Sequence, residues 1–95
     1  MVNRIQGRRA DYPLRMSSSH PLPALPSLPL GRYQHHKGGL YDVLDVVRHS
    51  ETLGPLVLYR PVDSDGTLWV RPFDMFTEQV QIDGRSVPRF RFLGA

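Results

Sequence analysis

The densest group of reactive side chains is the run from Arg48 to Thr52, formed by Arg48, His49, Ser50, Glu51 and Thr52. Histidine exchanges protons near neutral pH, hydroxyls donate hydrogen bonds, and a guanidinium binds anions. Sequential residues cannot face one another as a Ser-His-Asp relay requires, so no triad is predicted. We interpret the run as a ligand-contacting loop. The open alternative is a hairpin connection whose side chains hydrogen bond to their own backbone.

A second candidate group combines an aromatic ring with a guanidinium. Trp69 and Arg71 are two residues apart, so they share one face of a predicted strand. With Tyr59 from the neighbouring strand they form a predicted platform for stacking a base, another ring or a proline. In the alternative, Trp69 fills one end of a barrel and Arg71 pairs with Asp74 or Glu51.

Weaker candidates lie in and before a glycine turn. Lys37 precedes two glycines, and we include it among the binding residues, although the turn falls far short of a phosphate-binding loop. His35 and His36 are adjacent, and a strand would direct them to opposite faces. With no cysteine and no histidine pair at i,i+4 spacing, we predict neither a metal site nor a cofactor.

The composition predicts one small domain without disulfides. The chain has 95 residues and no cysteine, which limits it to a single domain and excludes a Cys-based zinc site. No apolar run approaches the roughly 20 residues of a membrane span, and the N-terminus lacks the apolar stretch of a secretory signal. We therefore expect a cytoplasmic protein without a membrane partner.

The net charge of +3 is concentrated in the first part of the chain. Residues 31–95 carry eight Lys and Arg against eight Asp and Glu, so this part is neutral. Nucleic-acid binding depends largely on a positive surface that neutralises phosphates. A small ligand or a peptide is therefore the favoured partner, and nucleic acid is not. The cluster of Arg85, Arg89 and Arg91 predicts a solvated strand edge that resists aggregation.

Residues 1–30 differ in character from the rest, and we expect a disordered or extended arm there. Residues 1–15 show no usable periodicity. Residues 22–30 repeat a Leu-Pro pair every three residues, which is the period of polyproline II. Either this segment docks into an aromatic groove of a protein partner, or it is a spacer or a strap on the protein's own aromatic residues.

Residues 31–95 alternate between β-branched or aromatic runs and clusters of turn formers. The longest predicted hairpin joins residues 40–48 to residues 56–60. The apolar phase changes near Leu44 and Asp45, which predicts a β-bulge. Further strands are predicted at residues 31–35, 68–71, 80–82, 85–87 and from Phe90 onward, with one helical turn at residues 73–77.

We expect a mainly β fold: a small, strongly bent, SH3-like barrel of five to six strands with one short helical turn, over residues 31–95. Roughly 65 residues is close to the lower size limit for a core without staples. Closing the sheet on itself would remove its exposed edges. A tight turn at Asp83-Gly84 would set Val80 opposite Val87.

Residues 31 to 90 also resemble a known family. The segments that resemble it are, in order, Gly31 to Leu44, Arg48 to Thr52, Leu56 to Tyr59, Leu68 to Pro72 with Met75 and Phe76, and Val87 to Phe90. They resemble the small bacterial family known as domain of unknown function 1653. The resemblance implies a compact bacterial cytoplasmic domain, and it implies no activity, cofactor or catalytic residue.

We therefore expect a non-enzymatic binding module that holds an anionic, nucleotide or peptide ligand on the loop of residues 48–52 and the platform of Tyr59, Trp69 and Arg71. One alternative is a small hydrolytic enzyme with His49 as general base. The other is a scaffold whose Leu-Pro arm engages a protein partner. We assign no catalytic residue, and the sequence indicates no particular oligomeric state.

Overall fold

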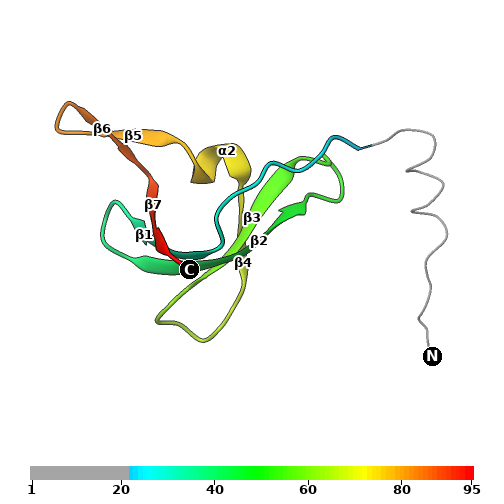
Figure 1. The fold of residues 1–95 in the computed structure, drawn as a ribbon, viewed down its shortest axis with the longest axis horizontal. Coiled ribbons are helices and arrows are strands. Elements are labelled where there is room, and N and C mark those ends of the chain that lie inside the picture. Colours follow the sequence, from blue (N-terminus) through cyan, green and yellow to red (C-terminus); the bar gives the residue numbers. More distant parts are fainter. Residues whose placement is uncertain (1–21) are drawn as a thin grey trace.

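The computed structural model describes residues 22–95 (Figure 1). In chain order its elements are β1 (Gly31–His35), β2 (Leu40–Arg48), β3 (Pro55–Pro61), β4 (Trp69–Pro72), α2 (Phe73–Phe76), β5 (Gln79–Ile82), β6 (Arg85–Pro88) and β7 (Phe90–Gly94). This part of the chain is mainly β with one short helix, as predicted. No helix in it is long and apolar enough to cross a membrane.

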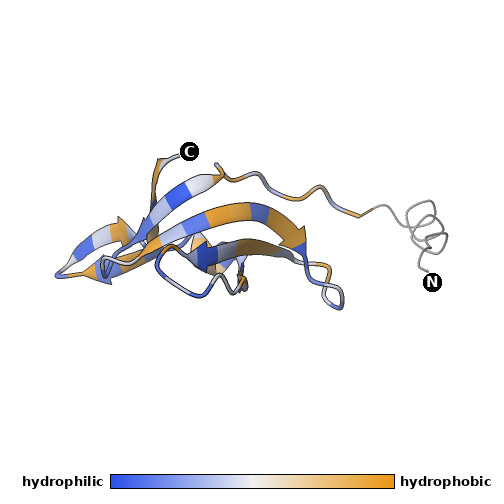
Figure 2. Cartoon of the chain, turned by 90° about the horizontal axis from the view of Figure 1, so that it is seen from below, coloured by the Kyte–Doolittle hydropathy of each residue, from blue (hydrophilic) through white to orange (hydrophobic). Residues whose placement is uncertain are grey.

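The hairpin of β2 and β3 forms the centre of a five-stranded antiparallel sheet with the order β4-β3-β2-β1-β7. Its register shifts between Val43 and Asp45, which confirms the predicted bulge. The Asp45 carboxylate accepts a hydrogen bond from the Val46 N–H at 2.8 Å, next to the point where the ladder is interrupted. The long strands arch strongly (Figure 2), as expected of a bulged sheet.

The sheet does not close, so the predicted barrel is wrong in this respect. Strands β4 and β7 lie at opposite edges and do not pair with each other. The residues between them form α2 and a separate two-stranded sheet of β5 and β6. Phe76 from α2 stacks on Phe90 from β7, with ring centroids 4.0 Å apart. Aromatic packing, rather than a backbone ladder, therefore connects the segment after β4 to the opposite edge strand.

The core lies on one face of the arched sheet. Val57 and Phe76 are its most buried side chains, at 0% and 1% exposure. Cross-strand partners share a face, so the pairing of Tyr33 with Tyr41 and of Val43 with Tyr59 fixes the inward set. The complete buried cluster is Tyr33, Val43, Val57, Tyr59, Phe76 and Phe90. It is small and mainly aromatic.

The hairpin of β5 and β6 projects beyond the main sheet (Figure 1). Val80 pairs with Val87, as predicted from its two-residue turn. Asp83 and Gly84 both adopt positive φ, at 50° and 75°, which matches the twist that a tight hairpin requires. Most side chains of this hairpin are exposed.

Residues 22–30 lie on the protein's own sheet, along a path from the β2–β3 hairpin to the start of β1 (cyan in Figure 1). The Tyr33 hydroxyl donates to the Pro29 carbonyl at 2.6 Å, and the Arg48 guanidinium donates to the Pro23 carbonyl at 2.7 Å. Leu28 packs against the core. This placement corresponds to the strap alternative for residues 22–30. The expectation for residues 1–21 lies outside the described residues.

Candidate ligand-binding site

Three aromatic rings and one guanidinium gather on the core face near the β4 edge, and we call them the aromatic platform: Tyr41, Tyr59, Trp69 and Arg71. The register pairs Tyr59 with Trp69 and Val57 with Arg71, so the pleat directs Trp69 and Arg71 to the same face. The ring centroids of Tyr59 and Trp69 are 6.1 Å apart, and those of Tyr41 and Trp69 are 6.5 Å apart. Tyr59 is buried, whereas Trp69 is 45% exposed.

Arg71 lies half-buried between two aromatic side chains. Its Nε–H donates to the Tyr59 hydroxyl at 3.2 Å, and its guanidinium carbon is 5.6 Å from the centroid of the Phe90 ring. No carboxylate within residues 22–95 lies at ion-pairing distance from it. The alternative in which Arg71 pairs with Asp74 or Glu51 is therefore not observed. One hydrogen bond leaves the Nη groups of this fork available to an anion.

His35 lies beside the platform. Its ring centroid is 4.9 Å from that of Phe90 and 6.4 Å from that of Tyr41. Its Nδ1 accepts a hydrogen bond from the Lys37 backbone N–H at 3.1 Å, so in the neutral ring Nε2 carries the proton. Its ring also contacts that of His36 at 4.3 Å, although adjacent strand residues should diverge. The reason is that β1 ends at His35 and His36 already belongs to the turn.

The pKa of His35 is lowered from 6.5, first by burial and then by the positive charges of His36, Arg71, Arg89 and Lys37. Those four groups come from the turn after β1, from β4 and from the residue before β7. Glu78 pairs with Arg89 at 2.6 Å and compensates one of the charges. The Arg89 Nε–H is buried and finds no acceptor within residues 22–95. The surroundings of His35 therefore favour an anion.

The run from Arg48 to Thr52 forms the connection between β2 and β3, and its polar groups bond mainly to that connection. His49 Nδ1 accepts from the backbone N–H groups of Glu51 and Thr52, at 3.0 and 3.2 Å. The Arg48 guanidinium donates to the Leu53 carbonyl at 3.1 Å. Ser50 and Glu51 are exposed. Both hydrogen bonds use the Nδ1 lone pair of His49, and this geometry gives no support to a general-base role.

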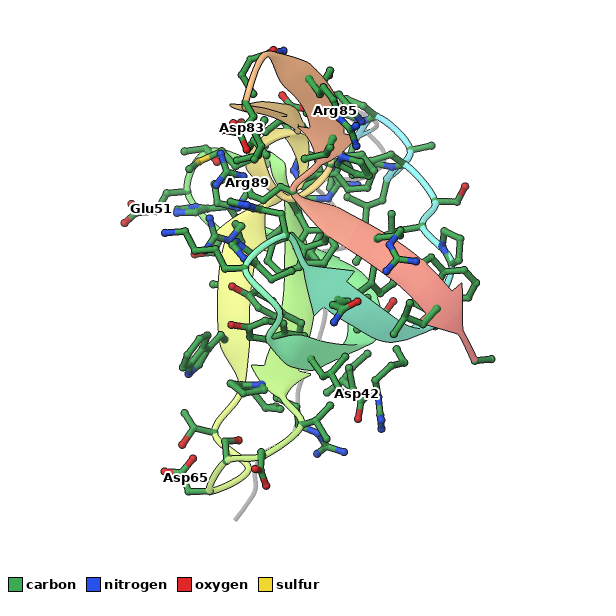
Figure 3. The ribbon with its side chains drawn as sticks, turned by 90° about the vertical axis from the view of Figure 1, so that its left-hand side faces the viewer. Asp42, Glu51, Asp65, Asp83, Arg85 and Arg89 are labelled. Atoms are coloured by element: carbon green, nitrogen blue, oxygen red, sulfur yellow. The ribbon has the colours of Figure 1, made fainter. Side chains whose placement is uncertain are left out.

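The structure divides the predicted residues between two places. His49 and Thr52 line a hollow of about 330 Å³ whose other walls include Pro72 and Asp74. Trp69, at the opposite end of β4, does not line it, and three strand residues span about 10 Å. Figure 3 shows the labelled Glu51 and Asp65 well apart, in the loops before β3 and before β4. Tyr59, Trp69 and Arg71 form a separate surface.

The sequence interpretation missed Tyr41 as a member of the platform and His35 as its neighbour. Tyr41 and Tyr33 are paired in the register, and His35 follows Tyr33 by two residues. The two-residue alternation of these side chains on either side of the glycine turn was therefore the sequence signal that could have placed them on the inward face. Lys37 lies in that turn, and its backbone N–H contacts His35. Within residues 22–95, no three His, Asp or Glu side chains gather as a metal site would require.

Comparison with known proteins adds the family. A model described as "Protein of unknown function (DUF1653)" matches residues 31–92. The chain belongs to the DUF1653 family. No curated protein matches the chain.

A crystal structure of a DUF1653 protein from Bordetella bronchiseptica is similar to this chain, with 27% identity and a TM-score of 0.66. The similarity covers 75% of this chain and 94% of that protein. The residues matched by the DUF1653 model include the whole aromatic platform and His35, and they begin after the Leu-Pro strap. The family match therefore covers the part of the chain that builds the site.

Proposed function

We propose that this DUF1653 protein is a binding module that holds a small ligand with an anionic group and a flat ring, such as a nucleotide, on the aromatic platform. The observation that carries this proposal is the partial burial of the Arg71 side chain without a carboxylate partner in the described part of the chain. Its guanidinium is half-buried among aromatic rings, and residues 22–95 supply no carboxylate to neutralise it. A partly desolvated charge without an anionic partner is costly, and an anionic ligand would reduce that cost.

The ring of the ligand would stack on Trp69. Trp69 is 45% exposed, and Tyr41 and Tyr59 pack around it. Stacking of a base on an aromatic side chain contributes about 1–3 kcal/mol. Trp69 and Arg71 are alternate residues of one strand, so they are about 7 Å apart along it. A ligand with its ring on Trp69 and its anionic group on Arg71 can therefore contact both.

Two features favour a single nucleotide over a nucleic-acid chain. Residues 31–95 are neutral overall, so they lack the extended positive surface that a polymer requires. Two positive side chains near the platform have no carboxylate partner within residues 22–95: Arg71 on β4 and Lys37 in the turn next to His35. Arg32, on the other face of the sheet, is already paired with Asp42 at 2.7 Å.

Titration with AMP, adenosine and inorganic phosphate, followed by Trp69 fluorescence and by NMR of the backbone amides, tests the proposal. AMP should change the Trp69 fluorescence and shift the amide signals of Trp69, Arg71 and His35. Arg71→Ala should weaken AMP binding roughly ten- to hundred-fold, because a hydrogen bond to a charged group contributes about 1.5–3 kcal/mol. Adenosine should bind weakly to both proteins.

Arg60→Ala is the matched control. Arg60 follows Tyr59 on the same strand, is exposed and points to the other face of the sheet. Its removal changes the net charge by the same amount and should leave AMP affinity unchanged. Equal AMP affinity for wild type and Arg71→Ala, or equal losses in Arg60→Ala and Arg71→Ala, would refute the assignment of the anion to Arg71.

A further inference from the structure

A second hollow, of about 400 Å³, lies between the end of β1, the turn that follows it and the β5–β6 hairpin. Its apolar wall is formed by Ile82, Val87 and Pro88, and its polar side includes Gln34, His36 and Arg91. This volume falls within the range of small-molecule sites. Because residues from three separated segments meet here, the hollow is a product of the folded chain.

None of the four residues of the aromatic platform lines this hollow. Gln34 alternates with the inward residues Tyr33 and His35, and Arg91 is its partner in the β1–β7 register. His35 lines this hollow and also packs against Tyr41 of the platform. A ligand held here would therefore occupy a site distinct from the one proposed above.

Arg91 lines the hollow and is oriented by a hydrogen bond to Gln34. Its Nη2 donates to the Gln34 side-chain oxygen at 2.9 Å, and the Gln34 amide donates in turn to the Gly38 carbonyl at 3.3 Å. The second bond orients the amide so that its oxygen faces Arg91. No carboxylate of residues 22–95 lies at ion-pairing distance from Arg91. The guanidinium is thus oriented while most of its donors stay available.

The opposite wall is an exposed apolar surface. Ile82 is 41% exposed at the end of β5, and Val87 is half-buried on the neighbouring strand. Placing Ile82 against solvent has a hydrophobic cost that an apolar ligand would reduce. The hollow therefore combines one fixed cation with an aliphatic wall.

We infer that this hollow binds a small carboxylate whose neighbouring carbon bears an aliphatic side chain. Arg91 takes the carboxylate through the planar match between a guanidinium and a carboxyl group, with His36 at its side. Ile82 and Val87 contact the aliphatic group. The carboxylate is either that of a free acid or the C-terminus of a peptide.

The experiment uses the whole chain and follows the amide signals of His36, Val87 and Arg91 by NMR. The probes are N-acetyl-leucine, its amide, and a tetrapeptide ending in leucine with a free or an amidated C-terminus. We expect the free carboxylates to shift these signals at millimolar concentration and the amides not to do so. Tighter binding of the free tetrapeptide assigns the ligand as a peptide C-terminus, and equal or weaker binding assigns it as a free acid.

Arg91→Ala should weaken the binding of N-acetyl-leucine roughly ten-fold or more, because it removes the charged donor. Gln34→Leu keeps Arg91 but removes its support, and it should weaken binding to a smaller extent. Arg85→Ala is the matched control, because the exposed Arg85 lies at the tip of the same hairpin (Figure 3) and does not line the hollow. Equal binding of the carboxylate and its amide, or unchanged affinity in Arg91→Ala, would overturn the inference.

Arg71→Ala separates this site from the proposed nucleotide site. It should abolish most AMP binding and leave N-acetyl-leucine binding intact, whereas Arg91→Ala should do the reverse. If each of these variants loses the binding of both AMP and N-acetyl-leucine, the assignment of two separate sites is wrong. Thermal unfolding of each variant shows that a loss reflects the site rather than the fold.

Discussion

At the scale of single residues, Arg71 owes its position to Tyr59. The Tyr59 hydroxyl is the acceptor for the Arg71 Nε–H, and the ring beneath it is buried in the core. The guanidinium is therefore oriented by a side chain that the fold itself holds in place. Such support keeps the Nη groups in position before a ligand arrives.

Replacing Tyr59 with Phe tests that support. The ring and its packing remain, while Arg71 loses its acceptor, so the free energy of unfolding should fall by about 0.5–1.5 kcal/mol. AMP affinity should fall less than in Arg71→Ala, because the charge remains. Urea denaturation and AMP titration measure the two effects. Tyr41→Phe is the control, and a larger loss of AMP affinity in that variant than in Tyr59→Phe would contradict the role given to the Tyr59 hydroxyl.

His35 should make stability depend on pH between about pH 7 and the lowered pKa of the folded state. Burial and the charges of His36, Arg71, Arg89 and Lys37 lower that pKa below 6.5. Over this window the unfolded chain binds more protons than the folded chain, so stability decreases as the pH falls through 6.5 towards the lowered pKa. The comparison is between urea midpoints of wild type and His35→Gln. An equally steep dependence in both proteins would exclude His35 as the cause.

Asp65 acts in a different pH window. Hydrogen bonds from Thr67 lower the Asp65 pKa below 3.8. Its contribution is therefore present above pH 3.8 and decreases only in stronger acid. Asp65 does not interfere with the measurement on His35.

At the scale of elements, the strap of residues 22–30 is fastened at two points. The Arg48 guanidinium bonds to both the Pro23 and the Leu53 carbonyls, so one side chain joins the strap to the tip of the β2–β3 hairpin. Leu28 and the Tyr33–Pro29 hydrogen bond anchor the strap nearer β1. We expect the strap to stabilise the fold.

Arg48→Ala should remove the two hydrogen bonds at the hairpin tip. At about 0.5–1.5 kcal/mol for each bond, unfolding should become easier by about 1–3 kcal/mol. The matched variant is Arg60→Ala, which removes an exposed arginine from the neighbouring strand and should change stability little. Denaturant unfolding measures both variants. An equal loss of unfolding free energy in the two would show that Arg48 does not stabilise the fold through the strap.

The junction of β1 and β7 depends on Gly31. Gly31 has a φ of 135°, and a Cβ there would lie 2.5 Å from the Gly94 carbonyl oxygen. Gly94 has a similar φ of 140°, but a Cβ there would meet no atom within 4 Å. Gly31→Ala should therefore cost more than the roughly 1 kcal/mol of backbone strain expected for Gly94→Ala. Thermal unfolding of the two variants compares them, and equal losses would show that the predicted clash is relieved at no cost.

At the scale of the whole molecule, residues 31–95 were predictable as strands because alternation and turn chemistry are local signals. The bulge at Val43 to Asp45 and the pairing of Val80 with Val87 both follow from neighbouring residues. Closure of the sheet was predicted wrongly because it depends on long-range pairing. The contact between Phe76 and Phe90 that replaces a ladder has no local signature.

The candidate site was predictable to a similar extent. The grouping of Tyr59, Trp69 and Arg71 follows from strand periodicity and hairpin register. His49 is far from Trp69 because the β2–β3 connection adjoins the Pro72 end of β4, and Trp69 lies at the other end. The register between β3 and β4 determines this, and the sequence does not give that register. The proximity of Arg89 to His35 depends on the path of the chain after β6, which the sequence alone did not indicate.

The arrangement of the elements predicts an uneven stability. The central strands β2 and β3 contain the buried Val43 and Val57, whereas the β5–β6 hairpin has a ladder of only two strands and few buried side chains. Amide hydrogen exchange should therefore protect β2 and β3 most and β5 and β6 least. Protection in β5 and β6 equal to that of the central strands would contradict this description.

The proposal that an anion binds beside Arg71 is tested most directly by the pKa of His35. NMR titration of the His35 ring should be carried out with and without saturating AMP, in wild type and in Arg71→Ala. Positive neighbours and burial lower this pKa in the free protein, so a bound phosphate should raise it in wild type. An unchanged or lower His35 pKa in the presence of bound AMP would contradict the proposed site.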